Sequence, residues 1–163
     1  MFRVSREIDF CYGHRLLNYP GKCRHLHGHN GRAIITIEAQ RLDDRGMVLD
    51  FADIKRVLSG WIDEHLDHRM ILHRADPAAP LLAKLGEPLV LLNTNPTAEN
   101  IARVIGDFAA ASGFPVVEVR LWETPRCCAA YCPDETPCAR IELVEVNAER
   151  GNRSVGPLEE EKT

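Results

Sequence analysis

Strict alternation of apolar and polar side chains at the start of the chain constrains the fold more than any other feature of the sequence. The odd positions between 2 and 10 are all polar, and the even positions carry Phe2, Val4, Ile8 and Phe10. Successive side chains of a strand point to opposite faces, so this pattern predicts a strand with one buried face. A second strand is predicted over about 29–41, where the residues in phase are Ala33, Ile35, Ile37 and Ala39.

Two amphipathic helices are predicted after these strands. Asp50 is a suitable N-cap for a helix that runs to about residue 65. Thr97 is a suitable N-cap for a second helix, which stops at Gly113. The stretch 69–88 between them is interrupted by prolines and a glycine and is predicted to be a connection.

Two further strands complete the predicted domain. One covers 115–124, and the other, made irregular by prolines, reaches Val146. The order strand, strand, helix, helix, strand, strand predicts a single α+β domain over 1–146, with a four-stranded antiparallel sheet and two helices on one face. The residues 147–163 are polar and predicted to be a disordered tail. Such a sheet has open edges, which favours sheets that join between subunits.

Composition and charge limit the cellular location that we expect for the protein and the classes of partner that it can bind. The formal net charge is −4, which favours neither a nucleic acid nor an anionic membrane as partner. No apolar run reaches the roughly 18–20 residues that span a bilayer. The first residues alternate like a strand rather than form a secretory leader, so a cytoplasmic location is expected. The six cysteines are then expected to be thiols or ligands rather than disulfides.

Four of the seven histidines fall within residues 14–29, and three of them share a face. His14 continues the apolar parity of the first strand, and His27 and His29 share the parity of the second. If these strand ends are antiparallel neighbours, the three imidazoles meet. Three neutral imidazoles suit Zn²⁺ and leave a fourth position open, as in catalytic sites. The alternative is a polar loop of solvated histidines; His25 has the wrong parity for the cluster.

Five ordered motifs, spread over about residues 2–132, give the chain a family resemblance. They are F-C-Y-G-H-R-L at 10–16, K-C-R-H-L-H-G-H-N at 22–30, L-D-H at 66–68, N-P-T-A-E-N at 95–100 and W-E-T-P at 122–125. The sequence resembles the 6-pyruvoyl-tetrahydropterin synthase family. The C-x3-H-G-H spacing of the second motif is similar to that of the bacterial branch, the 6-carboxytetrahydropterin synthases of the queuosine pathway.

The resemblance implies a fold, an assembly and a set of site residues. The fold is the tunnelling fold, in which the subunits of a homo-oligomer, here a hexamer, join their sheets into a barrel with active sites at subunit interfaces. The implied zinc ligands are His14, His27 and His29. The implied catalytic residues are Cys23, Asp67 and His68. The implied pterin-binding residues are Glu123, Thr97 and Glu99.

Physical chemistry gives these roles separate support and separate alternatives. A nearby cation stabilises the thiolate of a cysteine such as Cys23, although an inert thiol is the alternative. Asp67 can orient and charge-balance His68, but the pair alone is also typical of a helix end. Glu123 shares the parity of the buried face of its strand, so it needs a partner. That partner is either the donor edge of a pterin or an arginine.

The implied reaction starts from 7,8-dihydroneopterin triphosphate and needs zinc as a Lewis acid. One branch of the family eliminates triphosphate to give 6-pyruvoyl-tetrahydropterin. The other also breaks a side-chain carbon–carbon bond and gives 6-carboxy-5,6,7,8-tetrahydropterin and acetaldehyde; the cysteine spacing favours this branch. A non-catalytic zinc- or pterin-binding protein is the alternative from another class.

Two groups of residues stay without an assigned role. Lys22, Arg24 and Arg15 are candidates for binding the triphosphate, or they belong to a solvated loop. The second group departs from the family pattern and consists of Cys127, Cys128, Cys132 and Cys138. Four thiolates can hold a second zinc, but this spacing lacks the paired knuckles of a zinc ribbon.

Overall fold

One mixed sheet with helices packed on it forms the molecule, whose structure is a computed structural model describing residues 1–133, 140–147 and 150–154. The sheet order is β6-β5-β2-β1-β3-β4-β7-β8. Its strands are β1 (Phe2–His14), β2 (His27–Ala39), β3 (Arg69–His73), β4 (Leu89–Leu92), β5 (Val116–Thr124), β6 (Cys127–Tyr131), β7 (Leu143–Asn147) and β8 (Arg150–Ser154). No helix among the described residues is long and apolar enough to cross a membrane.

The β1–β2 hairpin confirms the predicted pairing of the two alternating strands. It is antiparallel, and its register runs without a break from Phe2 opposite Ala39 to His14 opposite His27. The same register places Ile8 opposite Ala33, so the apolar parity of both strands falls on one face. β5 extends this face by pairing Leu121 with Ala33.

The prediction of a four-stranded antiparallel sheet is wrong, because the described residues form an eight-stranded mixed sheet. Residues 69–88, predicted as a connection, contain β3 and a short helix α3 (Ala79–Lys84). β3 is parallel to both β1 and β4, so the sheet is mixed. The predicted last strand is two strands: β6 pairs with β5, whereas β7 pairs with β4 in the other half of the sheet.

The predicted tail also contributes to the sheet. Arg150–Ser154 forms β8, which pairs antiparallel with β7. The other residues of that tail beyond Asn147, 148–149 and 155–163, lie outside the described residues.

Both predicted helices and their caps are present. The first is continuous over α1 (Phe51–Ile54), a π-helical turn (Lys55–Ser59) and α2 (Gly60–His65), and the Asp50 side chain accepts a hydrogen bond from the Ala52 amide at 2.8 Å. The second is α4 (Ala98–Ala111), where the Thr97 hydroxyl accepts from the Asn100 amide at 3.4 Å. Gly113 follows it with φ +84°, a left-handed conformation that favours glycine.

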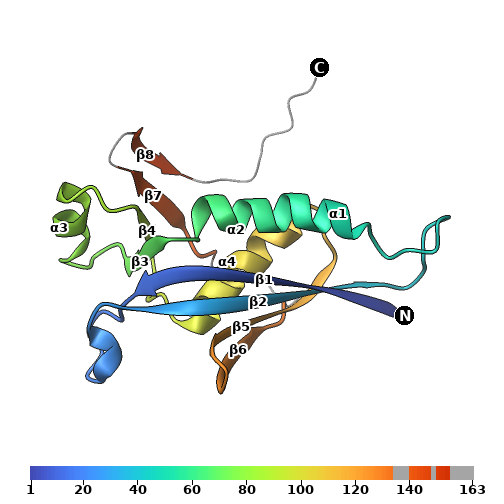
Figure 1. The fold of residues 1–163 in the computed structure, drawn as a ribbon, viewed down its shortest axis with the longest axis horizontal. Coiled ribbons are helices and arrows are strands. Elements are labelled where there is room, and N and C mark those ends of the chain that lie inside the picture. Colours follow the sequence, from blue (N-terminus) through green and yellow to red (C-terminus); the bar gives the residue numbers. More distant parts are fainter. Residues whose placement is uncertain (134–139, 148–149, 155–163) are drawn as a thin grey trace.

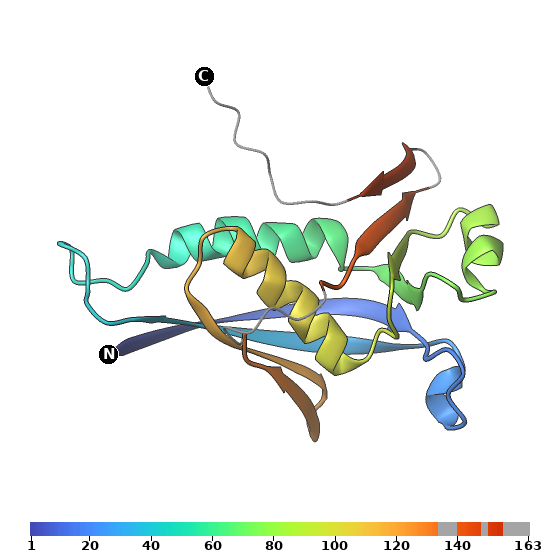
Figure 2. The same ribbon diagram turned by 180° about the vertical axis from the view of Figure 1, so that it is seen from behind.

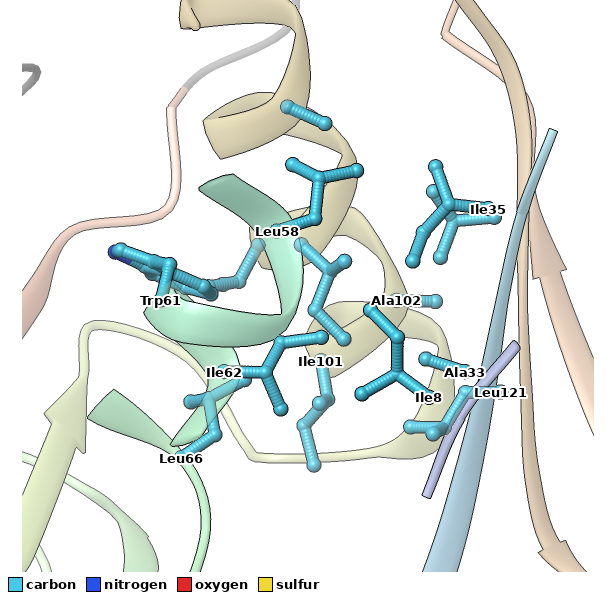
Figure 3. Close-up of a cluster of buried hydrophobic side chains, with 14 of the residues drawn as sticks. Ile8, Ala33, Ile35, Leu58, Trp61, Ile62, Leu66, Ile101, Ala102 and Leu121 are labelled. Atoms are coloured by element: carbon cyan, nitrogen blue, oxygen red, sulfur yellow. The ribbon is translucent and has the colours of Figure 1, made fainter. Parts of the chain in front are cut away.

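The core lies between the helices and the apolar face of the hairpin. Figures 1 and 2 show the α1–α2 helix and α4 running over the β1–β2 hairpin. Figure 3 shows Leu58, Ile62 and Ile101 of these helices pointing toward sheet residues such as Ile8 and Ile35. Burying one such side chain contributes roughly 1.5–3 kcal/mol, so this packing fixes the hairpin against the helices.

Candidate active site

The ends of β1 and β2 bring the three predicted histidines together. His14 and His27 are directly opposite each other, and His29 is opposite Tyr12. The ring centroids lie 4.5 Å apart for His14 and His27, and 5.0 Å apart for each pair that includes His29. One nitrogen from each ring lies within 4.8 Å of the other two. The parity argument is confirmed, and the alternative of three dispersed, solvated histidines is wrong.

Backbone carbonyls fix the direction of two of the rings. The Nδ1 atom of His14 lies 2.7 Å from the carbonyl oxygen of Pro96, and Nδ1 of His27 lies 2.8 Å from that of His25. A carbonyl can only accept, so Nδ1 of both rings carries a proton, and in the neutral tautomer Nε2 then carries a lone pair. Metal-binding histidines in proteins are commonly oriented in this way, by a hydrogen bond from the ring nitrogen that does not face the metal.

The two Nε2 atoms lie only 3.0 Å apart. With both protons held on Nδ1, two lone pairs face each other and need a cation between them. Nitrogen ligands of a tetrahedral zinc site lie about 3.3 Å from one another, which follows from bond lengths of about 2.0–2.1 Å. The three histidines therefore can hold a metal ion of this size.

Burial keeps His14 neutral. Its side chain is almost fully enclosed, and this desolvation lowers its pKa below the ordinary value of 6.5. The Pro96 carbonyl and Glu123 act in the opposite direction, and the two neighbouring histidines add to the lowering. A neutral imidazole is the form that binds a metal.

Glu123 lies beside the histidines at an irregularity in β5. The register of β5 with β6 shifts between Trp122 and Thr124, which leaves Glu123 outside the ladder. Its Oε1 atom lies 3.7 Å from Nε2 of His14 and 4.0 Å from Nε2 of His29.

Tyr12 is the hydrogen-bond partner of this carboxylate. Its hydroxyl donates to Oε1 of Glu123 at 2.9 Å. Burial first, and then the carboxylate, raise the pKa of Tyr12 far above its usual value of 10.0, so the phenol stays a donor. The interactions of Glu123 in the described part of the chain are with Tyr12 and two histidines, not with an arginine.

Asp67 and His68 form the pair predicted from the sequence, next to β1. Oδ2 of Asp67 lies 2.7 Å from Nδ1 of His68, and Oδ1 accepts from the Cys11 amide at 2.7 Å. The His68 amide donates to the Cys11 carbonyl, and its φ of +55° turns the exposed ring out of the sheet. Because Nδ1 of His68 faces Asp67, Nε2 on the opposite side of the ring points away from the Asp67 carboxylate.

Cys23 lies on a short 3-10 turn (Lys22–Arg24) in the loop between β1 and β2. Its carbonyl accepts from the Leu16 amide at 2.8 Å, and its half-buried thiol makes no hydrogen bond within the described residues. Asn95 fixes the start of this loop through both backbone groups of Leu17, at 2.8 and 3.0 Å. Within one chain, therefore, the Cys23 thiol makes no hydrogen bond to Asp67 or to His68.

Three of the other predicted contact residues, Thr97, Arg15 and Arg24, bond to neighbouring groups of the fold. Thr97 caps α4, and Glu99 is exposed in the first turn of that helix. Arg15, a triphosphate candidate, is bonded to Asp76 through both of its guanidinium edge nitrogens. Lys22 and Arg24 flank Cys23, and Arg24 donates to a ring nitrogen of His25 at 3.2 Å.

A groove beside the three clustered histidines connects several of these groups. Its walls include His29, Glu123, Asp67 and His68. The groove therefore joins the predicted pterin-binding carboxylate, one imidazole of the histidine cluster and the Asp67–His68 pair along one surface.

The cysteine-rich segment does not form a second metal site among the described residues. Cys127, Cys128 and Cys132 are exposed free thiols, and within the residues searched the three histidines are the sole cluster able to hold a metal. The fourth cysteine of the predicted group, Cys138, lies outside the described residues.

Sequence reasoning missed the residues that hold the site in place. Tyr12 has the parity of the buried face and was indistinguishable from a core residue. The carbonyls of Pro96 and His25 have no side-chain signature at all. Asn95 lies in one of the five motifs, as do Tyr12, His25 and Pro96, and that membership was the available signal for them.

Comparison with known proteins places these motifs in one family. The family model described as 6-pyruvoyl tetrahydropterin synthase matches residues 3–134. A Rickettsia bellii protein named 6-carboxy-5,6,7,8-tetrahydropterin synthase is 39% identical over 134 residues, which cover 78% of this chain and 97% of the relative. A Haemophilus influenzae protein of the same name is 32% identical over 139 residues, covering 80% of this chain and 99% of the relative.

Solved structures share the fold. An uncharacterised protein from Wolinella succinogenes superposes with a TM-score of 0.67 and 28% identity, covering 82% of this chain and 98% of its own. The 6-pyruvoyl tetrahydropterin synthase of Caenorhabditis elegans superposes with a TM-score of 0.61 and 24% identity, covering 82% of this chain and 96% of its own. The α+β tunnelling fold is confirmed by these neighbours.

Proposed function

Because the chain belongs to the 6-pyruvoyl tetrahydropterin synthase family, we propose that it is a zinc-dependent lyase acting on 7,8-dihydroneopterin triphosphate. With uptake of one water, the products are 6-carboxy-5,6,7,8-tetrahydropterin, acetaldehyde and triphosphate. Bacterial relatives named for this product support the choice of branch. The observation that carries the proposal is the pair of facing Nε2 atoms, 3.0 Å apart, beside a carboxylate.

His14, His27 and His29 would hold the zinc ion. When bound, zinc supplies Lewis-acid polarisation of oxygens on the substrate side chain. Three protein ligands leave a coordination position for such an oxygen.

Glu123 orients the pterin ring. The 2-amino group and N3–H of a pterin present two parallel donors, which a carboxylate accepts together. Glu123 lies within 4.0 Å of two of the three imidazoles, so a pterin held there lies beside the proposed metal site. Thr97 and Glu99, at the start of α4, are proposed to make further substrate contacts.

Cys23, Asp67 and His68 move the protons. The Cys23 thiolate accepts a proton from the substrate side chain, as a base can when a cation stabilises it. The hydrogen bond from Nδ1 of His68 to Asp67 fixes the tautomer, so that Nε2 exchanges protons with the thiol and the substrate.

The working form is a homo-oligomer, a hexamer, with its sites between subunits. In the described residues β1 bonds to β3 over Tyr12–His14 only, which leaves most of one edge of a long strand open, and β6 ends the sheet. Edges of this kind pair with other strands. The exposed His68 and the unbonded Cys23 thiol also fit a site completed by a second copy.

Free thiols fit a cytoplasmic enzyme. Five cysteines of the described residues are unpaired, as expected where thiols stay reduced. The proposed partner is the small pterin substrate, with neither nucleic acid nor membrane involved.

Product analysis tests the proposal. Purified protein loaded with zinc is incubated with 7,8-dihydroneopterin triphosphate, and the pterin and the small carbon products are identified. Acetaldehyde with 6-carboxytetrahydropterin is the expected result. Triphosphate elimination without carbon–carbon cleavage would assign the chain to the 6-pyruvoyl branch, and absence of turnover would favour a zinc- or pterin-binding protein.

A further inference from the structure

The Tyr12 side chain occupies a place built for it between the metal-binding histidines and Glu123. Tyr12 is 3% exposed, its ring stacks on Phe10 with centroids 5.3 Å apart, and it meets His14 edge-on at 5.4 Å. The lack of a side chain at Gly31 makes room for the ring, since a Cβ atom there would lie 2.8 Å from Cε1 of Tyr12. The ring therefore has little freedom, and its hydroxyl has a fixed position.

The hydroxyl binds the one oxygen of Glu123 that faces the histidines. Oε1 accepts the bond from Tyr12 at 2.9 Å and is the same atom that lies 3.7 Å and 4.0 Å from Nε2 of His14 and His29. Ligand atoms of a tetrahedral zinc site are about 3.3 Å apart. A movement of less than about 1 Å, on that geometry, would make Oε1 a fourth ligand.

The backbone does not hold Glu123 in place. Glu123 lies at the register shift of β5, where the residue has no partner in the ladder. Its carboxylate orientation therefore depends on side-chain contacts, of which the bond from Tyr12 is the shortest.

We propose that Tyr12 is a positioning residue that holds Oε1 of Glu123 off the metal. The bond keeps the fourth coordination position free for the substrate, and Oε2 together with the second lone pair of Oε1 stays available for the two donors of the pterin. Without the hydroxyl, the carboxylate moves onto the metal and closes the site. This inference rests on the proposed function, because it takes a metal ion at the three histidines as given.

The test uses Co²⁺ as a visible probe of coordination in the 163-residue chain. Tyr12→Phe keeps the ring and removes the hydroxyl. Its matched control is Tyr131→Phe, which removes another hydroxyl–carboxylate bond, to Asp107 at 3.1 Å, remote from the histidines. The expected result is a changed visible spectrum in the Tyr12→Phe protein and the wild-type spectrum in the control.

A double variant identifies the cause of the change. Tyr12→Phe combined with Glu123→Gln removes the carboxylate that would reach the metal, so the wild-type spectrum should return. Glu123→Gln alone should leave the spectrum unchanged. In the Tyr12→Phe protein, transfer of Co²⁺ to a chelator should also be slower, because the carboxylate adds a ligand. We expect a slowing of about tenfold, the lower end of the range by which groups around a metal site alter its affinity.

Three results would overturn the inference. They are a wild-type spectrum in the Tyr12→Phe protein, a changed spectrum that persists in the double variant, and a changed spectrum in Glu123→Gln alone. Failure of the wild-type protein to bind Co²⁺ would instead reject the proposed metal site, and this inference with it.

Discussion

At the scale of single residues, the site depends on hydrogen bonds that orient reactive atoms from outside. Pro96 and His25 contribute only carbonyl oxygens, yet these oxygens decide which nitrogen of His14 and His27 faces inward. Tyr12 plays the equivalent part for Glu123. In each case the group that touches the ligand is held by a group that does not, which is the usual division of labour around metal sites.

Removing one imidazole tests the metal site, and the neighbouring histidine supplies the control. His27→Ala should lower the bound metal from one ion per chain to none. Changing a group that only hydrogen-bonds to a ligand lowers metal affinity roughly 10–100-fold, and removing the ligand itself lowers it further. His25→Ala should retain one ion, since His27 is held by the backbone carbonyl of residue 25 and not by its ring. Metal analysis after dialysis measures both. Retention of the metal by His27→Ala would contradict the assignment.

The Arg15–Asp76 ion pair should stabilise the end of β1 in a pH-dependent way. The Asp76 carboxylate is buried, which raises its pKa, but the bonds from Arg15 and the Ala78 amide outweigh burial and hold the pKa below the ordinary 3.8. Asp76→Asn should therefore lower the free energy of unfolding at pH 7 by on the order of 2 kcal/mol, less than for a fully buried pair because the Arg15 side chain is 24% exposed.

The sign of the pH effect follows from the lowered pKa. The charged carboxylate stabilises the fold above pH 3.8, and this contribution is lost as the pH falls through the lower value in the folded state. Denaturant titrations from pH 7 to pH 2.5 should show the difference between wild type and Asp76→Asn shrinking below that point. Asp9→Asn removes the exposed pair with Arg32 and should change stability little. Equal losses in the two variants would refute the argument.

At the scale of elements, the turn between α2 and β3 is anchored on both sides. Oε1 of Glu145, a buried residue of β7, lies 2.8 Å from Nδ1 of His65 at the end of α2 and 3.8 Å from Nη2 of Arg69 at the start of β3. Asp67 and His68 lie between these two contacts. A strand distant in sequence thus holds the segment that carries the proposed proton-transfer pair.

Glu145→Gln should lower turnover although residue 145 does not line the groove. The amide can still accept from His65 but loses the charge that faces Arg69, so the Asp67–His68 turn is less constrained. We expect kcat to fall severalfold with KM nearly unchanged, because the histidines and Glu123 are not affected. Glu142→Gln, which removes an exposed pair with Arg74, is the control for charge. A lower melting temperature with unchanged kcat would mean that Glu145 serves stability alone.

The sequence predicts those elements whose apolar residues recur with the period of a half-buried strand or helix, and it misses those without such a period. β1 and β2 cover the core on one face only, so their alternation predicted the register that joins His14 to His27. β4 and the middle of β3 are runs of apolar residues, as is typical of buried parallel strands, and period two cannot detect them. The partners of β6 and β7 were missed because pairing at opposite ends of a sheet leaves no local pattern. The same limit hid Tyr12, whose role lies in a contact with Glu123, 111 positions away.

At the scale of the whole molecule, the proposed oligomer accounts both for the open edges of the sheet and for the missing hydrogen bond between Cys23 and the Asp67–His68 pair. The free part of β1 and the outer edge of β6 offer unpaired backbone groups at opposite sides of the β6-β5-β2-β1 half of the sheet. A neighbouring copy that pairs along these edges makes a heterologous contact, and such contacts close into a ring when the rotation from one copy to the next divides a full turn evenly. In a ring, the exposed His68 of one copy can approach the Cys23 loop of the next.

Mixing two inactive variants tests whether a site is shared between copies. Cys23→Ala and His68→Ala should each lose turnover, since each removes a member of the proposed proton-transfer set. If every site takes Cys23 from one copy and His68 from another, random one-to-one hybrids contain about a quarter intact sites, because each half is native with a probability of about one half. Turnover after co-refolding should therefore recover to about 25% of the wild-type value. Mixed without refolding, preformed oligomers that do not exchange subunits should stay inactive, which excludes contamination by wild-type enzyme. If both groups come from the same chain, no hybrid contains an intact site. The absence of recovery in hybrids of verified mixed composition would therefore reject the shared site, while leaving the proposed metal site at the three histidines unaffected.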